Sequence, residues 1–385
     1  NNTAIGKEAL CANTTADNNT AVGSLSLSAN TTASNNTAVG QESLLSNTTG
    51  CENVSVGRQS MRLNTTGNKN VAVGIYSLEA NTTAEGNTAL GACTLLANTT
   101  GAPNTAVGLE SLKVNTTGVR NTAVGAYALD ANTTGNDNTA FSQSTLSANT
   151  TGSDNTAVGR LALLANTTAN DNTAVGKRAL CSNTTGVDNV AVGSCALDSS
   201  ITGSSNVAVG YSALTTNTAS NNTAVGHLAM RFNTSGGNNT AIGLKAGCNI
   251  TTGGANVVIG DSSGADGSMI NITSENNRAV FGHNSITNAY VKVAFTVTSD
   301  QRDKTNLGTV PHGLDFVNQL NPVSFQFKKS RDNDTPHGDM RYGFLAQDIL
   351  ALEGDNPIII DNEFEDALKY KGEHLVPVLV NAIKE

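Results

Sequence analysis

Few residues of this 385-residue chain have the type and spacing to do chemistry. The most suggestive pair is Ser299 and Lys304, five residues apart in a charged C-terminal segment. A serine hydroxyl is a weak nucleophile that needs an adjacent base. A lysine can be that base only where desolvation leaves it neutral. The spacing alone is common, and Ser299 with Asp300 is equally typical of the cap of a helical turn.

Other reactive residue types show no spacing that indicates a metal or cofactor site, so we expect neither a metal nor a cofactor. The repeats offer no paired carboxylates in a cleft-forming context and few aromatic rings for sugar stacking, so activity on an external glycan is not expected. The cysteines are interpreted as small apolar fillers, with disulfides or interchain pairs as the alternative. They are Cys11, Cys51, Cys93, Cys181, Cys195 and Cys248.

Most of the chain is a tandem repeat of 17 residues, typified by the N-T-A-V-G motif at 19–23. We call the last position of this motif the glycine slot. An asparagine precedes every slot by four positions, a leucine usually follows it by four, and a second asparagine usually follows it by seven. Such a sustained period indicates a solenoid. The slots are Gly6, Gly23, Gly40, Gly57, Gly74, Gly91, Gly108, Gly125, Ser142, Gly159, Gly176, Gly193, Gly210, Gly226, Gly243 and Gly260, with one step, to Gly226, shortened by one residue.

The T-A-V segment predicts a short strand with Thr and Val on one face and Ala on the other. Gly and Asn at fixed places are expected to supply the positive φ that tight corners need. A coil of 17 residues is then one rung of a parallel β-solenoid, and sixteen rungs at ~4.8 Å extend over about 75 Å. Stacked asparagines can form amide ladders. We prefer this explanation to N-glycosylation, although many of them fit the acceptor pattern.

One chain alone offers each rung little to bury. A buried Val or Leu contributes about 1.5–3 kcal/mol, whereas ordering each backbone residue costs about 1–2 kcal/mol. We therefore expect several parallel chains to pack side by side as a homo-oligomer, with a homotrimer preferred, although composition alone does not select three.

Composition limits the partners. The chain has a formal net charge of −9 and no basic patch, which argues against a nucleic-acid partner. It contains no run of 18 apolar residues, so we expect no membrane insertion, and no signal peptide is visible. Because the sequence begins within a repeat and without Met, we expect it to be a piece of a longer protein.

Composition changes sharply near residue 300, since the last 87 residues carry 24 of the 53 charges. We divide the chain into a β-solenoid shaft (1–260), a β connector (261–298) and a small α+β domain (299–385). The expected elements beyond the shaft are strands at 269–272, 279–281, 290–297, 323–327 and 357–360, polar turns at 330–338, and helices at 313–320, 346–352 and 375–383.

The last domain resembles the intramolecular chaperone of endosialidases and other phage tail fibres, the peptidase S74 family. The resemblance is carried in order by S-D-Q-R-D-K-T-N at 299–306, L-N-P-V-S-F at 320–325, G-F-L-A-Q-D at 343–348 and the helix at 375–384. The repeats look like the head repeats of trimeric autotransporter adhesins of the YadA type and like similar arrays in viral fibres, which implies a trimer.

The family resemblance implies that the domain trimerises, assists winding of the upstream fibre, and then cuts itself off. It makes Ser299 the nucleophile, Lys304 its base and Thr298–Ser299 the cleavage site of a single-turnover autoprotease. Asp303 occupies a position where the family usually has an apolar residue, and a carboxylate there would oppose deprotonation of the lysine. The histidines at 312, 337 and 374 are expected to have structural or solvent-exposed roles.

These observations favour a structural protein: a trimeric viral (phage tail) fibre, assembled in the host cytoplasm, that attaches to a cell-surface receptor, glycan or protein. The rest of the virion would be held through a part of the protein preceding residue 1. The alternative is a bacterial surface trimeric adhesin or filament of the same architecture. An enzyme acting on an external glycan is the least favoured of the three.

Overall fold

The computed structural model describes residues 1–265, 268, 270–286, 289–292, 299–330, 333–363 and 368–385. The chain divides into two compact units, one formed by Asn1–Asp266 with Asn271–Phe281 and the other by Gly267–Ile270 with Gly282–Glu385. The first unit is a parallel β-solenoid with a 17-residue period, and the second is a small α+β unit that ends in a helix. The predicted fold class is thereby confirmed.

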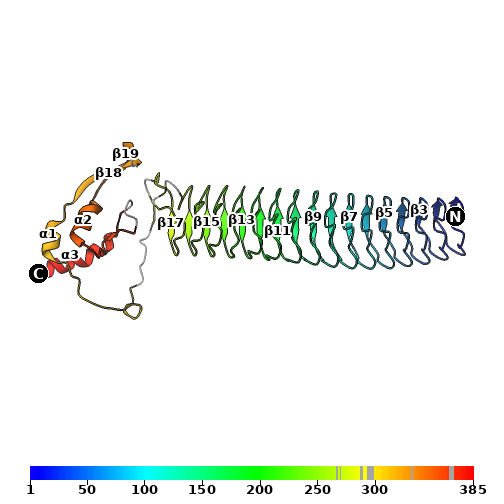
Figure 1. The fold of residues 1–385 in the computed structure, drawn as a ribbon, viewed down its shortest axis with the longest axis horizontal. Coiled ribbons are helices and arrows are strands. Elements are labelled where there is room, and N and C mark those ends of the chain that lie inside the picture. Colours follow the sequence, from blue (N-terminus) through cyan, green and yellow to red (C-terminus); the bar gives the residue numbers. More distant parts are fainter. Residues whose placement is uncertain (266–267, 269, 287–288, 293–298, 331–332, 364–367) are drawn as a thin grey trace. The chain divides into compact units, whose positions relative to one another are not determined.

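Each coil of the shaft contributes one three-residue strand to a single parallel sheet that follows its whole length (Figure 1). Neighbouring strands pair without slippage, as in Thr122↔Thr139 and Ala123↔Ala140. Within the described residues, the 17 strands of this sheet are β1 (Thr3–Ile5), β2 (Thr20–Val22), β3 (Thr37–Val39), β4 (Val54–Val56), β5 (Val71–Val73), β6 (Thr88–Leu90), β7 (Thr105–Val107), β8 (Thr122–Val124), β9 (Thr139–Phe141), β10 (Thr156–Val158), β11 (Thr173–Val175), β12 (Val190–Val192), β13 (Val207–Val209), β14 (Thr223–Val225), β15 (Thr240–Ile242), β16 (Val257–Ile259) and β17 (Ala279–Phe281).

Strand β17 extends the sheet past the last regular repeat and confirms the predicted strand at 279–281. The strand expected at 269–272 is wrong for the described residues 270–272, which form a bend and an irregular segment. Residues 290–292 also lack strand structure, and the rest of that predicted strand lies outside the described residues.

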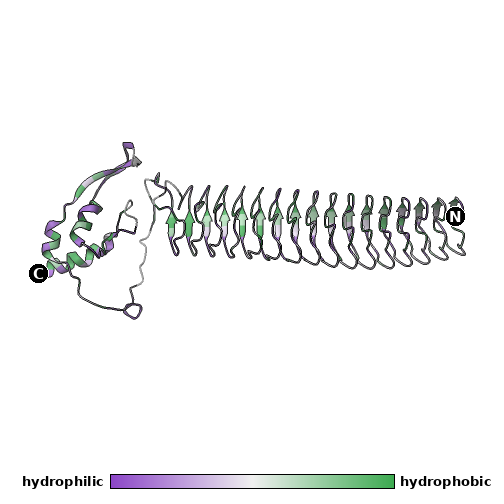
Figure 2. Cartoon of the chain, viewed as in Figure 1, coloured by the Kyte–Doolittle hydropathy of each residue, from purple (hydrophilic) through white to green (hydrophobic). Residues whose placement is uncertain are grey.

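The strands alternate as predicted, with the central residue inside the coil and its two neighbours outside. Ala123 and Leu129 are completely buried, and the corresponding positions in the coils of β2–β16 are also buried, whereas β1 at the end of the shaft is exposed. Figure 2 shows the resulting row of apolar strands along the shaft. The core of each coil is therefore filled by its own chain, and the Thr and Val side chains face outward.

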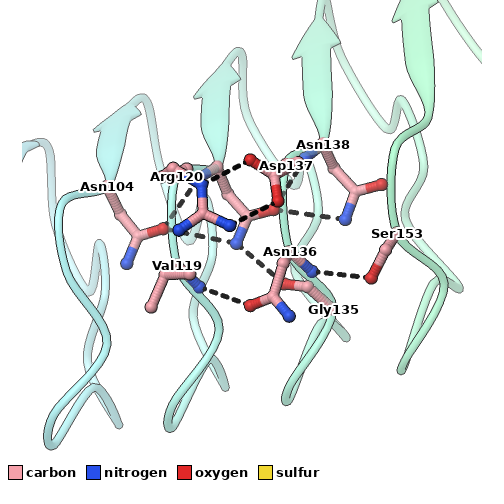
Figure 3. A network of polar contacts seen from close by, with 9 residues as sticks. Asn104, Val119, Arg120, Gly135, Asn136, Asp137, Asn138 and Ser153 are labelled. Carbon is pink, nitrogen blue, oxygen red and sulfur yellow. Dashed lines mark hydrogen bonds and ion pairs between the residues drawn. The ribbon is translucent and has the colours of Figure 1, made fainter.

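A column of buried asparagines joins the coils through the residue four before each slot. The Asn121 backbone N–H donates to Asn104 Oδ1 at 2.9 Å, and the Asn138 N–H donates to Asn121 Oδ1 at 3.0 Å (Figure 3). The Asn121 Nδ2 donates to the Gly135 carbonyl at 2.8 Å. Each amide thus satisfies buried polar groups in two coils.

A second amide column lies seven residues after the slot. Asn132 Nδ2 donates to Asn115 Oδ1 at 2.9 Å and to the Gly135 carbonyl at 3.0 Å, and Asn149 Nδ2 donates in turn to Asn132 Oδ1 at 2.9 Å. These side chains are fully buried. The predicted ladder is confirmed, and burial makes these asparagines unavailable as glycosylation acceptors in the folded shaft.

The glycine slots have φ between +120° and +141°, as expected for glycine. A Cβ added at Gly125 would clash with the Ser142 carbonyl of the next coil, so the close stacking also disfavours a side chain at this slot, although the next slot is occupied by Ser142. The expectation that asparagines also supply positive φ is confirmed only five positions before the slot, as in Asn18 (60°) and Asn35 (62°), and is wrong for the recurrent asparagines four before and seven after it. Positive φ falls on other positions, such as Tyr127 (60°), Leu129 (52°) and Asp137 (57°), while the recurrent asparagines bridge coils.

The second unit combines short helices with two small antiparallel sheets, β18–β19 and β20–β21. The predicted helices and the strand at 323–327 are confirmed; the strand at 357–360 is confirmed only at its end. The polar turn expected at 330–338 is wrong for residues 333–338, which belong to β19. The elements are η1 (Gln301–Asp303), α1 (Leu314–Gln319), β18 (Val323–Ser330), β19 (Asn333–Gly343), α2 (Ala346–Glu353), β20 (Ile360–Asp361), β21 (Lys369–Tyr370), η2 (Gly372–His374) and α3 (Leu375–Lys384).

In the described residues, the structure bears on the cysteines, on metal binding and on membrane spanning. No disulfide joins the cysteines in the described part of the chain; Cys181 is buried, but Cys11 is exposed, so the filler interpretation is wrong for Cys11. No group of three or more His, Cys, Asp or Glu is placed to hold a metal ion. None of the helices has the length and apolarity needed to cross a bilayer.

One coil interrupts the second amide column and yields a stability prediction. Ser200 replaces the asparagine, and its buried Oγ has no hydrogen-bond partner among the described residues. We expect Ser200→Asn to restore the amide contacts between Asn183 and Asn217 and to stabilise the shaft by about 1–2 kcal/mol. Chemical denaturation measures the change, with Ser200→Ala as the control that only removes the unpartnered hydroxyl. A variant no more stable than this control would contradict the role of the ladder.

Candidate functional site

The predicted pair, Ser299 and Lys304, is brought together by one turn of 3-10 helix. Asp300 caps this turn, η1, by accepting a hydrogen bond from the Arg302 backbone N–H at 2.9 Å. The turn reverses the chain so that Lys304 Nζ donates to Ser299 Oγ at 2.8 Å. Both interpretations of the sequence apply here. Asp300 caps the helical turn, and this turn brings Lys304 to Ser299.

An ion pair between Arg302 and Asp300 stabilises the same turn. The Arg302 guanidinium donates to both carboxylate oxygens of Asp300, with Nη2–Oδ2 at 2.6 Å. The hydrogen bonds from the Arg302 side chain and backbone lower the pKa of the Asp300 carboxyl, and Asp300 raises the pKa of Arg302. Asp300 is therefore ionised at neutral pH and engaged by Arg302, which leaves Lys304 to contact the serine.

The pair has the geometry for proton transfer but not the burial that the chemistry requires. Ser299 and Lys304 are both exposed in the single chain. Water stabilises an ammonium group, whereas a general base must be neutral. The arrangement can activate the hydroxyl only where another surface covers it and removes water.

The other residues considered from sequence lie as follows. Thr298, on the far side of the predicted cleavage site, lies outside the described residues. Asp303 ends the η1 turn and is exposed. His312 stacks on Phe316 with ring centroids 4.2 Å apart, His337 contacts the Ser285 carbonyl at 3.2 Å, and His374 lies 3.8 Å from the Glu373 carboxylate. None of these histidine contacts involves Ser299 or Lys304.

A second candidate site is the outward face of the shaft sheet, which we call the outer sheet face. It consists of the first and third residues of strands β1–β17, all of which lie in the described part of the chain. These positions hold only Thr, Val, Ile, Leu, Phe and one Ala, so the face carries no charge over its entire length. Many of the side chains are half-exposed, such as Leu90 at 47% and Phe141 at 45%. A continuous apolar face of this length is typical of an interaction surface.

Sequence reasoning missed one structural carboxylate in the second unit. Glu353, at the end of α2, accepts hydrogen bonds from three consecutive backbone N–H groups, those of Ile358 at 2.8 Å, Ile359 at 2.7 Å and Ile360 at 2.9 Å. Ile359 and Ile360 belong to the buried core of this unit with Phe316, Ile349, Leu375 and Val378. Glu353 therefore positions two core side chains, and no local sequence pattern indicates this contact.

Comparison with known proteins identifies one similarity. Residues 299–355 match the family model described as the chaperone of endosialidase, Peptidase S74. The match includes both residues of the Ser–Lys pair and Glu353, and it covers a minor part of the chain. A comparison with curated proteins gives no match.

The Glu353 contacts yield a prediction for the second unit. We expect Glu353→Gln to destabilise this unit by about 1–3 kcal/mol, because it loses a charge-assisted acceptor for three backbone N–H groups, two of them partly buried. Hydrogen exchange should show faster exchange of the amides at 358–360. Asp355→Asn removes a nearby exposed carboxylate and serves as the control. Unchanged protection in Glu353→Gln would show that the carboxylate does not position this segment.

Proposed function

We propose that this chain forms the shaft and the C-terminal assembly chaperone of a homotrimeric viral fibre. The observation that carries the proposal is the succession, in one chain, of a regular β-solenoid and a segment that matches the chaperone of endosialidase. A solenoid of near-identical coils has many ways to wind incorrectly, and a chaperone at its end supplies a defined starting point.

The outer sheet face supports side-by-side packing of identical chains. It is uncharged, and it repeats every ~4.8 Å along the shaft. A parallel sister chain presents the same repeat at the same heights, so apolar rows meet without a charge mismatch. Burying Val and Leu side chains on this face adds to the stability of coils that are thin when single.

Cleavage at Thr298–Ser299 fits the same assembly. The Lys304–Ser299 hydrogen bond is formed in the single chain, but both groups are exposed. Contact with neighbouring chains would remove water from the pair and favour the neutral lysine that the reaction needs. Release of the chaperone would then follow assembly. The Ser299 hydroxyl adds to the Thr298 carbonyl carbon while the lysine takes its proton. The Thr298–Ser299 C–N bond then breaks and the proton passes to the Ser299 nitrogen, which leaves the Thr298 acyl group as an ester on the serine oxygen. Water hydrolyses this ester to the Thr298 carboxylate and restores the serine hydroxyl.

The fibre would act in host attachment, outside the cell in the mature virion. Its receptor, a surface glycan or protein, would contact the variable corners of the coils, and its other end would join the rest of the virion. The similarity to an endosialidase chaperone favours this over a bacterial adhesin of the same architecture.

Self-cleavage gives a direct prediction. We expect denaturing electrophoresis of the expressed chain to show separate shaft and chaperone fragments, and mass spectrometry to place Ser299 at the start of the smaller one. Ser299→Ala should remain full length, and Asp303→Leu should cleave faster because it removes a carboxylate next to the base. Identical full-length bands for the wild type and Ser299→Ala would exclude autoproteolysis.

The trimer has its own test. Light scattering of Ser299→Ala, which keeps each chain at about 39.3 kDa, should give the mass of three chains. Val124→Lys should dissociate the assembly because it places a charge in the outer sheet face. The control Asp154→Lys changes the charge at a position outside this face and should stay trimeric. A monomeric Ser299→Ala protein would contradict the proposal.

A further inference from the structure

The regularity of the shaft creates a problem for an assembly of parallel chains. Successive coils present nearly the same outward residues, so a neighbouring chain displaced by one coil meets almost the same surface. A displacement of one chain by one coil therefore loses only the interchain contacts of a single coil at each end of the shaft. Residues that differ from their column are therefore the only features of this face that can specify the axial alignment.

The coil that contains β9 departs from the repeat twice, at adjacent positions. Its outward third residue is Phe141, between Val124 on β8 and Val158 on β10 in the paired strands. Among the outward positions of β1–β16, all in the described part of the chain, Phe141 is the one aromatic residue. Its side chain is 45% exposed and lies in the centre of the strand series.

The next residue, Ser142, occupies the glycine slot. Its φ is 122°, a region that non-glycine residues rarely adopt. The backbone is nevertheless held as in the other coils, since the Ser142 N–H donates to the Val124 carbonyl at 2.8 Å and Thr145 Oγ1 donates to the Ser142 carbonyl at 2.9 Å. Backbone strain next to the one aromatic side chain among the outward positions of β1–β16 singles out this coil.

We propose that Phe141 sets the axial register between copies of this chain, so that the aromatic rings of sister chains meet at one height on the outer sheet face. The inference rests on the homotrimer proposed above. A second copy is the occupant because it supplies an uncharged face with the same 17-residue spacing and an equivalent ring at the same level. A slip by one coil separates the rings and places each against the smaller Val124 or Val158.

Phe281 on β17 supplies a second ring in the same column, at the end of the shaft, with 63% of its side chain exposed. The two rings lie eight strands apart, so displacing one chain by one coil relative to its neighbour moves both rings away from the equivalent rings of that neighbour. Phe141 acts far from the chaperone unit in sequence, and it would keep the middle of the shaft aligned when the end is already paired.

The test uses the full chain with Ser299→Ala and an aliphatic diazirine amino acid of leucine size in place of Leu90. This native leucine lies on the outer sheet face three coils from Phe141, so the probe adds no aromatic ring. After refolding and irradiation, peptide mass spectrometry identifies the coil of the neighbouring chain that is cross-linked. We expect the wild-type shaft to link to the same coil.

Phe141→Val makes this position identical to its neighbours, so the coil should fold. We expect products displaced by 17 residues to increase about tenfold relative to in-register products, the scale of one aromatic pair. Phe141→Val/Val158→Phe moves the ring by one coil and should restore a single register. Ser142→Gly keeps the ring and should retain the wild-type pattern.

Three outcomes would overturn the assignment: an unchanged pattern in Phe141→Val, a double variant that stays scrambled, or loss of register in Ser142→Gly. Light scattering separates these from failure of the trimer itself. If the parent is monomeric and gives no interchain product, the proposed function fails; if all variants are trimeric, the cross-links report register alone.

Discussion

The shaft depends on the stacking of identical polar groups at identical heights. A buried amide is costly unless its donors and acceptor are all used. In this fold the Asn121 side chain meets that condition only because Gly135 and Asn138 stand in fixed positions in the next coil. Each coil therefore requires a neighbour of the same geometry, and the 17-residue period is preserved because insertions would break both amide columns together.

The same constraint explains where departures from the repeat occur. The one shortened repeat lies between Asn217 and Asn222, in a corner, and the strands on both sides stay paired in register. The second amide column ends where Ile250 replaces the asparagine, and Asn233 Oδ1 is left without a partner among the described residues. Variation is thus tolerated in corners and at the ends of a column, whereas an interruption in the middle, as at Ser200, leaves a buried group unsatisfied.

Much of the fold could be predicted from sequence because one pattern is repeated many times. The strand positions, the buried Ala and Leu and the amide ladder all follow from the period. The backbone conformation of the corners did not follow, because residues such as Leu129 adopt positive φ against their own preference when stacking fixes the coil. In the second unit, the polar segment at 330–338 suggested turns, yet residues 333–338 lie in β19, where a two-stranded sheet has edges that accept Pro336. The contact of Lys304 with Ser299 is local and was predictable, whereas the three-amide contact of Glu353 depends on tertiary structure.

Stability and specificity make opposite demands on such a shaft. Identical coils stack well, but identical surfaces leave the alignment of neighbouring chains undefined. In the proposed trimer, a chaperone unit at one end would fix the alignment there, and its influence would have to pass through every coil to reach the other end. A residue that differs from its column on the outer sheet face would specify the alignment of the chains at its own height along the shaft. The Phe141 side chain takes no part in the buried amide ladders, so its coil keeps the contacts that hold the solenoid together. Beside it, Ser142 replaces the glycine that the slot favours and adopts the same positive φ. Stacking requires the buried residues of successive coils to be alike. Residues of the outer sheet face are free of this requirement, so differences there can specify the alignment of chains and contacts with other molecules.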